Sequence, residues 1–122
     1  MKLEKLVINE QALEELAKIP MDDAQKSWDF SIELDNARGH VKKWREKQHE
    51  LVKKYGNPVE GNPDQFTIPT EKVSEFQKEI GKLGEVEVTV KFPKIPINEL
   101  NGAKISAGTI SALRELCILT KK

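Results

Sequence analysis

A single helical pattern, running from Asp22 to Tyr55, constrains the fold more than any other feature of this chain. The segment contains no proline, and its only glycine is Gly39. Mostly apolar residues recur at alternating steps of four and three, which places them along one face of a helix, called the seam below: Phe30, Leu34, Ala37, Val41, Trp44, Gln48, Leu51 and Tyr55. At about 1.5 Å per residue the helix would be roughly 50 Å long. A chain of 122 residues is too small to bury such a helix by itself. We therefore expect the apolar face of the helix to bind another protein surface, as in a coiled coil.

Charge along this helix changes from acidic to basic. Residues 22–37 include five acidic residues and one basic residue, whereas residues 38–54 include seven basic residues and two acidic ones. This order complements the helix macrodipole, each charge near a terminus contributing about 0.3–1 kcal/mol. The same order favours antiparallel pairing, in which each acidic half faces a basic half. Gly39 costs about 1 kcal/mol relative to alanine and indicates a close approach or a bend.

The remaining sequence predicts shorter elements. We expect a strand over 3–8, a helix between Asn9 and Pro20, and a polar loop over 57–65 with a short strand over 65–68. Caps are expected at the helix ends, in chain order Asn9, Asp22, Gly56, Thr70 and Ser106.

The C-terminal portion, 70–118, reads as helix, strand and helix. Its strand is the alternating run 86–92, in which valines and Phe92 are separated by polar residues. Leu113, Leu116 and Cys117 are expected to face inward from the last helix. The whole chain, 1–122, is therefore predicted to be one domain of the α+β class, predominantly helical. The long helix of 22–55 would pack on shorter helices and on a small sheet of two or three strands.

Composition limits the classes of function. Twenty basic residues balance twenty acidic ones, whereas proteins that bind nucleic acid or anionic membranes usually carry a basic excess. The single cysteine, Cys117, excludes an intrachain disulfide and fits a reducing compartment. No apolar run is long enough to cross a bilayer, and the N-terminal residues do not form a signal peptide. We expect a soluble intracellular protein without a membrane partner.

Residues with catalytic or ligand-binding chemistry are few. His40 and His49 are nine residues apart and lie on different faces of the helix, so they cannot share a metal ion. No neighbouring pattern makes Cys117 a nucleophile. The run Gly81–Gly84 lacks the preceding strand and the spacing of a phosphate-binding loop. The sequence predicts no catalytic, cofactor or metal site, and hence a protein that is not an enzyme.

The basic half of the long helix allows a nucleic-acid contact as an alternative. Lys42, Lys43 and Arg45 lie next to Trp44, and basic and aromatic residues together can hold a single strand. However, Trp44 lies in register with the apolar seam, and two glutamates dilute the basic charge. Nucleic acid is therefore the less favoured partner.

Several short motifs follow one another in a definite order along the chain. Lys54-Tyr55-Gly56 ends the long helix, Phe76-Gln77-Lys78-Glu79 lies in the next helix, and the segment Ile95–Leu100 follows the valine-rich run. This order, from about Ala12 onward, resembles a group of small proteins encoded by tailed bacteriophages and prophages. The resemblance carries no activity to any residue. It implies a phage origin and a product located in the host cytoplasm or in the virion.

These observations predict a non-enzymatic phage protein that acts through protein–protein interaction, as a virion-associated or assembly component and as a possible homo-oligomer. Its buried contacts would be the seam residues Phe30, Leu34, Val41, Trp44, Leu51 and Tyr55. Two alternatives stay open: an inhibitor of a host defence or replication protein, and a nucleic-acid-binding accessory protein. A competing interpretation is that the seam packs on the chain's own later helices.

Overall fold

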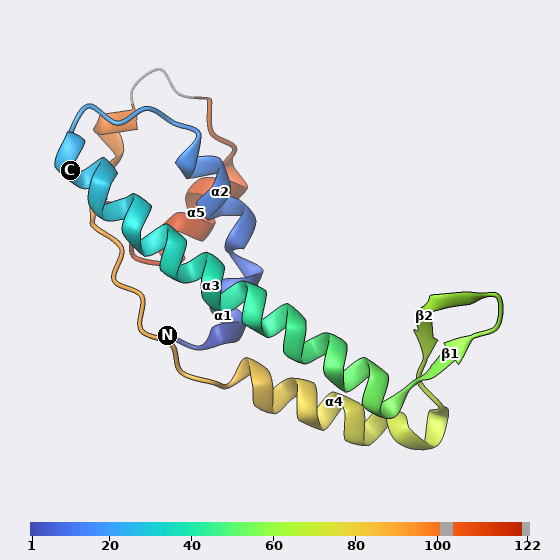
Figure 1. Ribbon diagram of the computed structural model, residues 1–122. Coiled ribbons are helices and arrows are strands. Elements are labelled where there is room, and N and C mark those ends of the chain that lie inside the picture. The colour runs from blue at the N-terminus through green and yellow to red at the C-terminus, as the bar shows by residue number, and fades with distance from the viewer. Residues whose placement is uncertain (101–103, 121–122) are drawn as a thin grey trace.

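The computed structural model of the protein describes residues 1–100 and 104–120, with only the backbone at 63 and 64. Helices form most of it: α1 (Leu3–Ile8), α2 (Glu10–Ala17), α3 (Ala24–Tyr55), α4 (Thr70–Gly84) and α5 (Ala107–Glu115). Two short sheets join β1 (Asn57–Val59) to β2 (Asn62–Thr67) and β3 (Ile95–Pro96) to β4 (Leu119–Thr120), and a 3-10 turn, η1, covers Ile97–Leu100. Figure 1 shows the long α3 with the shorter helices packed along it. The predicted α+β, mainly helical class is confirmed.

Local sequence fixes both ends of α3. The carboxylate of Asp23, one residue beyond the expected cap Asp22, accepts hydrogen bonds from the backbone N–H groups of Gln25 and Lys26. Gly56 ends the helix as expected, and its N–H donates to the Val52 carbonyl at 2.8 Å. A Cβ at position 56 would lie 2.6 Å from that same oxygen, so the close approach requires glycine.

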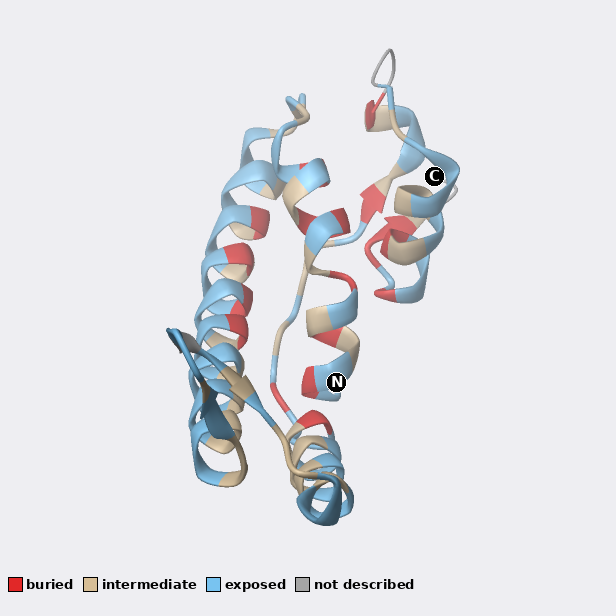
Figure 2. Ribbon diagram, turned by 90° about the vertical axis from the view of Figure 1, so that its right-hand side faces the viewer, coloured by how far each residue is buried: buried red, intermediate tan, exposed pale blue. Residues whose placement is uncertain are grey.

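One hydrophobic core lies along the N-terminal half of α3. It is built from α1, α2, the segment around Val88 and the C-terminal elements, which together cover one face of α3 (Figure 2). The α3 residues of this core are at most 5% exposed: Phe30, Leu34, Ala37 and Val41. The chain therefore covers this part of the seam with its own residues, although the cover comes from the earlier helices α1 and α2 and an extended segment and not from the later helices of the competing interpretation.

The C-terminal half of α3 leaves the core and forms an arm with the β1–β2 hairpin and α4 (Figure 1). Helices α3 and α4 run side by side, and the rings of Tyr55 and Phe76 meet edge to face at 6.2 Å. Gly84 is the only buried residue of α4, although this helix is strongly amphipathic. Its apolar residues are half-buried: Val73, Phe76, Ile80 and Leu83. Two helices alone are too thin to enclose a core, so the arm keeps part of its apolar seam open.

The predicted strand over 3–8 is wrong, because these residues form helix α1. Leu3 and Leu6 are three residues apart, which places both on one helix face, and both are buried. Packing of these leucines outweighs the strand preference of the β-branched pair at 7 and 8.

The predicted strand over 86–92 is also wrong. An isolated antiparallel bridge between Lys2 and Glu87 is the pairing that the structure gives this run, and Val88 donates its N–H to the Met1 carbonyl at 2.9 Å. The alternation is retained from 88 to 92, since Val88 is buried, Val90 and Phe92 are half-buried and the residues between them are exposed, whereas Val86 is exposed. The run is extended but lacks a partner strand, so α3 side chains hold it instead. Glu33 accepts from the Lys91 N–H at 3.1 Å.

The predicted polar loop over 57–65 is a β-hairpin. Strands β1 and β2 pair antiparallel, and Gly61 adopts a positive φ of 81° in the turn between them. Residues 65–67 of the expected short strand lie in β2, and Ile68 follows the end of this strand. Thr70 does not cap α4 with its side chain; Pro69 occupies the cap position and Thr70 is the first helical residue.

Helix α5 begins as expected, because the Ser106 hydroxyl accepts from the Thr109 N–H at 3.1 Å. Its end differs from the prediction. Cys117 is exposed rather than inward-facing and has a φ of +62°, the left-handed region. The N–H of Ile118 bonds to the Leu113 carbonyl, and the N–H of Cys117 bonds to the Arg114 carbonyl. This is a Schellman motif in which cysteine stands where glycine is usual.

Candidate functional site

The structure divides the six predicted interface residues into two groups. Phe30, Leu34 and Val41 lie in the chain's own core, so the prediction that they contact a partner is wrong for this fold. Coverage comes from α1 and α2, which precede α3 in the chain, and from the extended segment over 86–92, which follows it. The other three residues, in the arm, are half-exposed: Trp44, Leu51 and Tyr55. The arm is thus the part of α3 that could still bind a partner.

An apolar groove lies where the arm meets the core, between α1, α3 and α4. Its volume is about 260 Å³, and its apolar walls are Val7, Ile8, Trp44 and Ile80. Gly81 and Gly84 form the α4 side, and Glu4 lies at the rim. Ile8 is 70% exposed, the largest exposed fraction among the big apolar residues that the structure describes.

Glycine keeps this groove open. A Cβ at Gly81 would meet no atom within 4 Å, so the space above this turn of α4 is empty. At Gly84 a Cβ would lie 3.2 Å from the Cβ of Glu4, so α1 and α4 approach closely there. The groove is therefore closed at Gly84, where α1 and α4 approach, and open at Gly81, where a side chain from another protein could bind.

A second groove follows the opposite side of the α3–α4 pair. Leu51, Leu83 and Val86 form its apolar floor, and its volume is about 450 Å³. Charged side chains of both signs form the walls: Lys47, Glu50, Lys54, Glu79 and Lys82. Four of these charges form two ion pairs, each within its own helix: Lys47 Nζ with Glu50 Oε2 at 3.4 Å, and Lys82 Nζ with Glu79 Oε1 at 3.3 Å. Because of this mixed rim, the second groove is less apolar than the first.

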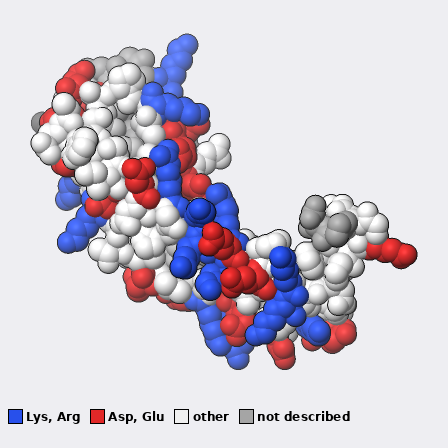
Figure 3. Space-filling model, in the orientation of Figure 1, with Lys and Arg blue, Asp and Glu red and all other residues white. Residues whose placement is uncertain are grey.

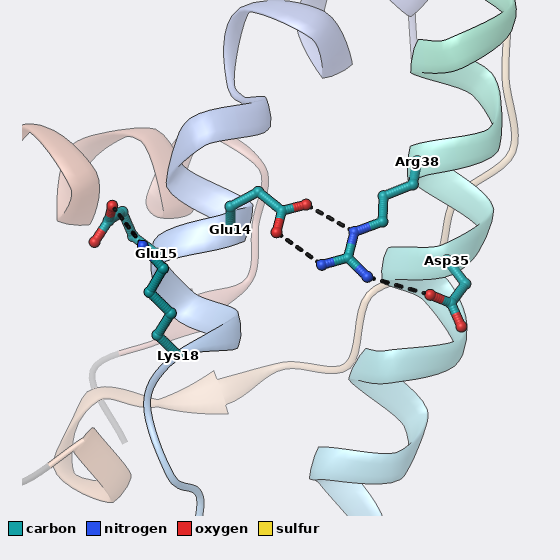
Figure 4. Close-up of polar contacts among 5 residues, drawn as sticks. All are labelled: Glu14, Glu15, Lys18, Asp35 and Arg38. Carbon is teal, nitrogen blue, oxygen red and sulfur yellow. Dashed lines mark hydrogen bonds and ion pairs between the residues drawn. The ribbon is translucent and has the colours of Figure 1, made fainter.

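Ion pairs fix α2 against α3, next to the core. The guanidinium of Arg38 donates two hydrogen bonds to Glu14, from Nε at 2.8 Å and from Nη2 at 2.7 Å (Figure 4). These bonds lower the pKa of the Glu14 carboxyl below its ordinary value. Asp35 contacts the same guanidinium at 3.4 Å, and Lys18 pairs with Glu15 within α2. The two-point contact sets the spacing of α2 and α3.

Of the three residues proposed for nucleic-acid contact, Arg45 is paired with a carboxylate, whereas Lys42 and Lys43 are not paired in the described structure. Arg45 Nη2 bonds to Glu10 Oε2 at 2.7 Å, so its charge is directed toward α2. Lys42 and Lys43 are exposed, and the structure gives neither an ion pair. Basic and acidic side chains alternate over the visible face of the molecule (Figure 3). This mixed surface does not form the continuous basic stripe typical of nucleic-acid binding, although the two lysines stay accessible.

Residues with other chemistry are dispersed. His40 is half-buried, whereas His49 is exposed and packs its ring edge against Phe66 at 6.4 Å. Across residues 1–100 and 104–120, no three His, Cys, Asp or Glu side chains are placed to hold a metal ion. The same part of the chain contains no helix long and apolar enough to span a membrane.

Sequence reasoning missed Ile8, Ile80 and Gly81 as site residues. The sequence did contain a signal for Ile80 and Gly81. Gly81 and Gly84 are three residues apart, so they lie on one face of α4, next to the apolar face that contains Ile80. Ile8 could not be found, because its exposure depends on α1 being a helix. Comparisons of the chain with protein-family models, with curated proteins and with solved structures give no match.

Proposed function

We propose that this chain is a non-enzymatic phage protein that binds another protein through its arm, as a virion-associated or assembly component. The observation that carries the proposal is the open apolar groove at Trp44, lined by Ile8 and Ile80 and kept free by Gly81. Apolar surface of this kind, at the junction of a projecting arm and a core, is typical of protein-binding sites.

The size of the groove favours a protein side chain as its occupant. About 260 Å³ is below the volume of most cofactor and small-molecule pockets, which hold roughly 300–1,000 Å³. It suits one or two aliphatic or aromatic side chains from a partner helix. Burial of one such side chain stabilises a complex by about 1.5–3 kcal/mol. Trp44 and Ile8 would be the main contacts, since large apolar residues in a pocket dominate interface energies.

The phage assignment is supported by the sequence resemblance from about Ala12 onward, which implies a location in the host cytoplasm or the virion. The nature of the captured partner separates the two versions of the function. A structural protein of the particle supports an assembly role, and a host defence or replication enzyme supports an inhibitor.

The test is capture of partners from phage-infected cells, measured by quantitative mass spectrometry. Ile8→Arg places a charge at the groove, and Gly81→Arg fills it, while neither position is packed in the fold. Matched controls place the same arginine elsewhere on the surface, at Ile97 and Ser74. We expect both groove variants to lose a partner that both controls retain. Equal recovery with all four variants would show that the groove is not the binding site.

A further inference from the structure

The outer face of α3, opposite the buried seam, has no covering element in the described structure. Positions 28, 32, 35, 39 and 42 follow steps of four and three, so they share this face. Trp28 is 66% exposed and Ile32 is 51% exposed, and together they make an apolar pair one helical turn apart. The core lies on the other side of α3, as Figure 2 shows. A face with a solvated tryptophan and isoleucine is a candidate contact surface.

Opposite charges lie on the two sides of Gly39 along this face. Asp29 and Asp35 precede it, and Lys42 and Lys43 follow it. Asp35 makes a long contact of 3.4 Å with Arg38, whose shorter bonds go to another residue. The two lysines have no ion pair in the described structure. Each half of the face therefore keeps charge that its own chain does not neutralise.

Gly39 marks the centre of this arrangement. It lies inside a long helix, where glycine costs about 1 kcal/mol relative to alanine. The fold gives no intrachain reason for it, because a Cβ at this position would meet no atom within 4 Å. Absence of a side chain allows a second backbone to approach closely.

We propose that two copies of this chain pair through the outer faces of α3, antiparallel and crossing at Gly39. Asp35 of each copy then lies opposite Lys42 and Lys43 of the other copy, once on each side of the crossing. In this register Ile32 and Trp28 lie near Glu46 and Glu50 of the second helix, and the stems of the neighbouring lysines at 47 and 53 cover part of the apolar pair. The face carries both halves of the complementary pattern, which is the property that a two-fold symmetric contact between identical chains requires.

This pairing is independent of the groove at Trp44. The groove lies on the side of α3 that faces α1 and α4, so both surfaces can be occupied together. Failure of the dimer would leave the proposed binding function untouched, and failure of the groove variants would leave the dimer untouched.

The test is a charge exchange read by sedimentation equilibrium and light scattering at low ionic strength. One variant, Asp29→Lys with Asp35→Lys, replaces the acidic charges that precede Gly39 with basic ones. A second, Lys42→Glu with Lys43→Glu, replaces the basic charges that follow Gly39 with acidic ones. We expect the natural chain to show twice its 13.9 kDa mass, each variant to be monomeric, and an equal mixture of the two to form a mixed dimer. Circular dichroism confirms that each variant is folded.

The control makes the same change of charge on α4, at the exposed positions Lys72 and Lys78, and should leave the dimer intact. High salt should dissociate the natural dimer, because screening shortens the range of its charge contacts. A natural chain that is monomeric at high protein concentration would overturn the proposal. So would a dimer unaffected by either variant, or lysine variants that lose only oligonucleotide binding.

Discussion

The substitution Phe30→Ala tests whether the long helix is covered by its own chain or by a partner. Phe30 is 3% exposed, and its ring packs against that of Phe92 with centroids 5.6 Å apart. Removal of a buried phenylalanine ring costs about 3–5 kcal/mol. The lost ring pair places the expected cost near the upper half of this range, about 4 kcal/mol. A domain of this length has a total unfolding free energy of roughly 6–18 kcal/mol, so the loss is a large fraction of it.

The matched control is Trp28→Ala, two residues away on the same helix. Trp28 is 66% exposed, so its removal should change the unfolding free energy of the monomer by no more than about 0.5 kcal/mol. The assay is urea denaturation followed by circular dichroism, at low protein concentration and high ionic strength, and again at a much higher concentration. The cost of Phe30→Ala should not depend on concentration. A cost below about 1 kcal/mol, or one that appears only in concentrated samples, would refute the intrachain covering of the seam.

Three further predictions concern local features of the fold. Gly39→Ala should raise the unfolding free energy of the monomer by about 1 kcal/mol, because the added methyl meets no neighbour; urea denaturation measures it, and a loss would reveal a steric constraint. Cys117→Gly should add about 1 kcal/mol by the same assay, because glycine adopts the positive φ without strain, whereas Cys117→Ala should add nothing. The Glu14–Arg38 bond lowers the folded-state pKa of Glu14, so its stabilisation is present above the ordinary pKa of 4.5 and is lost as pH falls through the lowered value. At this half-exposed site it should contribute less than about 1 kcal/mol, and the stability difference between the natural chain and Glu14→Gln should vanish in acid; a difference that persists there would contradict the assignment.

Sequence patterns predicted the elements whose cause is local. The periodic run, the glycine at 56 and the serine at 106 act within one or two turns, so α3 and the start of α5 were found nearly at their observed ends. The cap at Asp22 was wrong by one residue, since two adjacent aspartates offer the same chemistry. The amphipathic face of α4 was found for the same local reason.

Site prediction failed where contacts join distant residues. Trp44 was named, but its groove needs α1 as a helix and α4 brought against it through a hairpin. No local pattern specifies the approach of Glu4 to Gly84.

The sequence alone determined that this chain contains one long helix with an apolar face, a change of charge from acidic to basic along its length and defined ends, because hydrogen bonds and side-chain spacing within a helix are local. Tertiary structure alone decided that residues 3–8 form a helix, that residues 86–92 are extended without joining a sheet, and that half of the apolar seam of α3 is covered. Those outcomes depend on contacts such as Leu3 N–H to the Val86 carbonyl at 2.8 Å, between segments distant in the chain. Their free energy comes from burial of surfaces that meet only after the chain has folded.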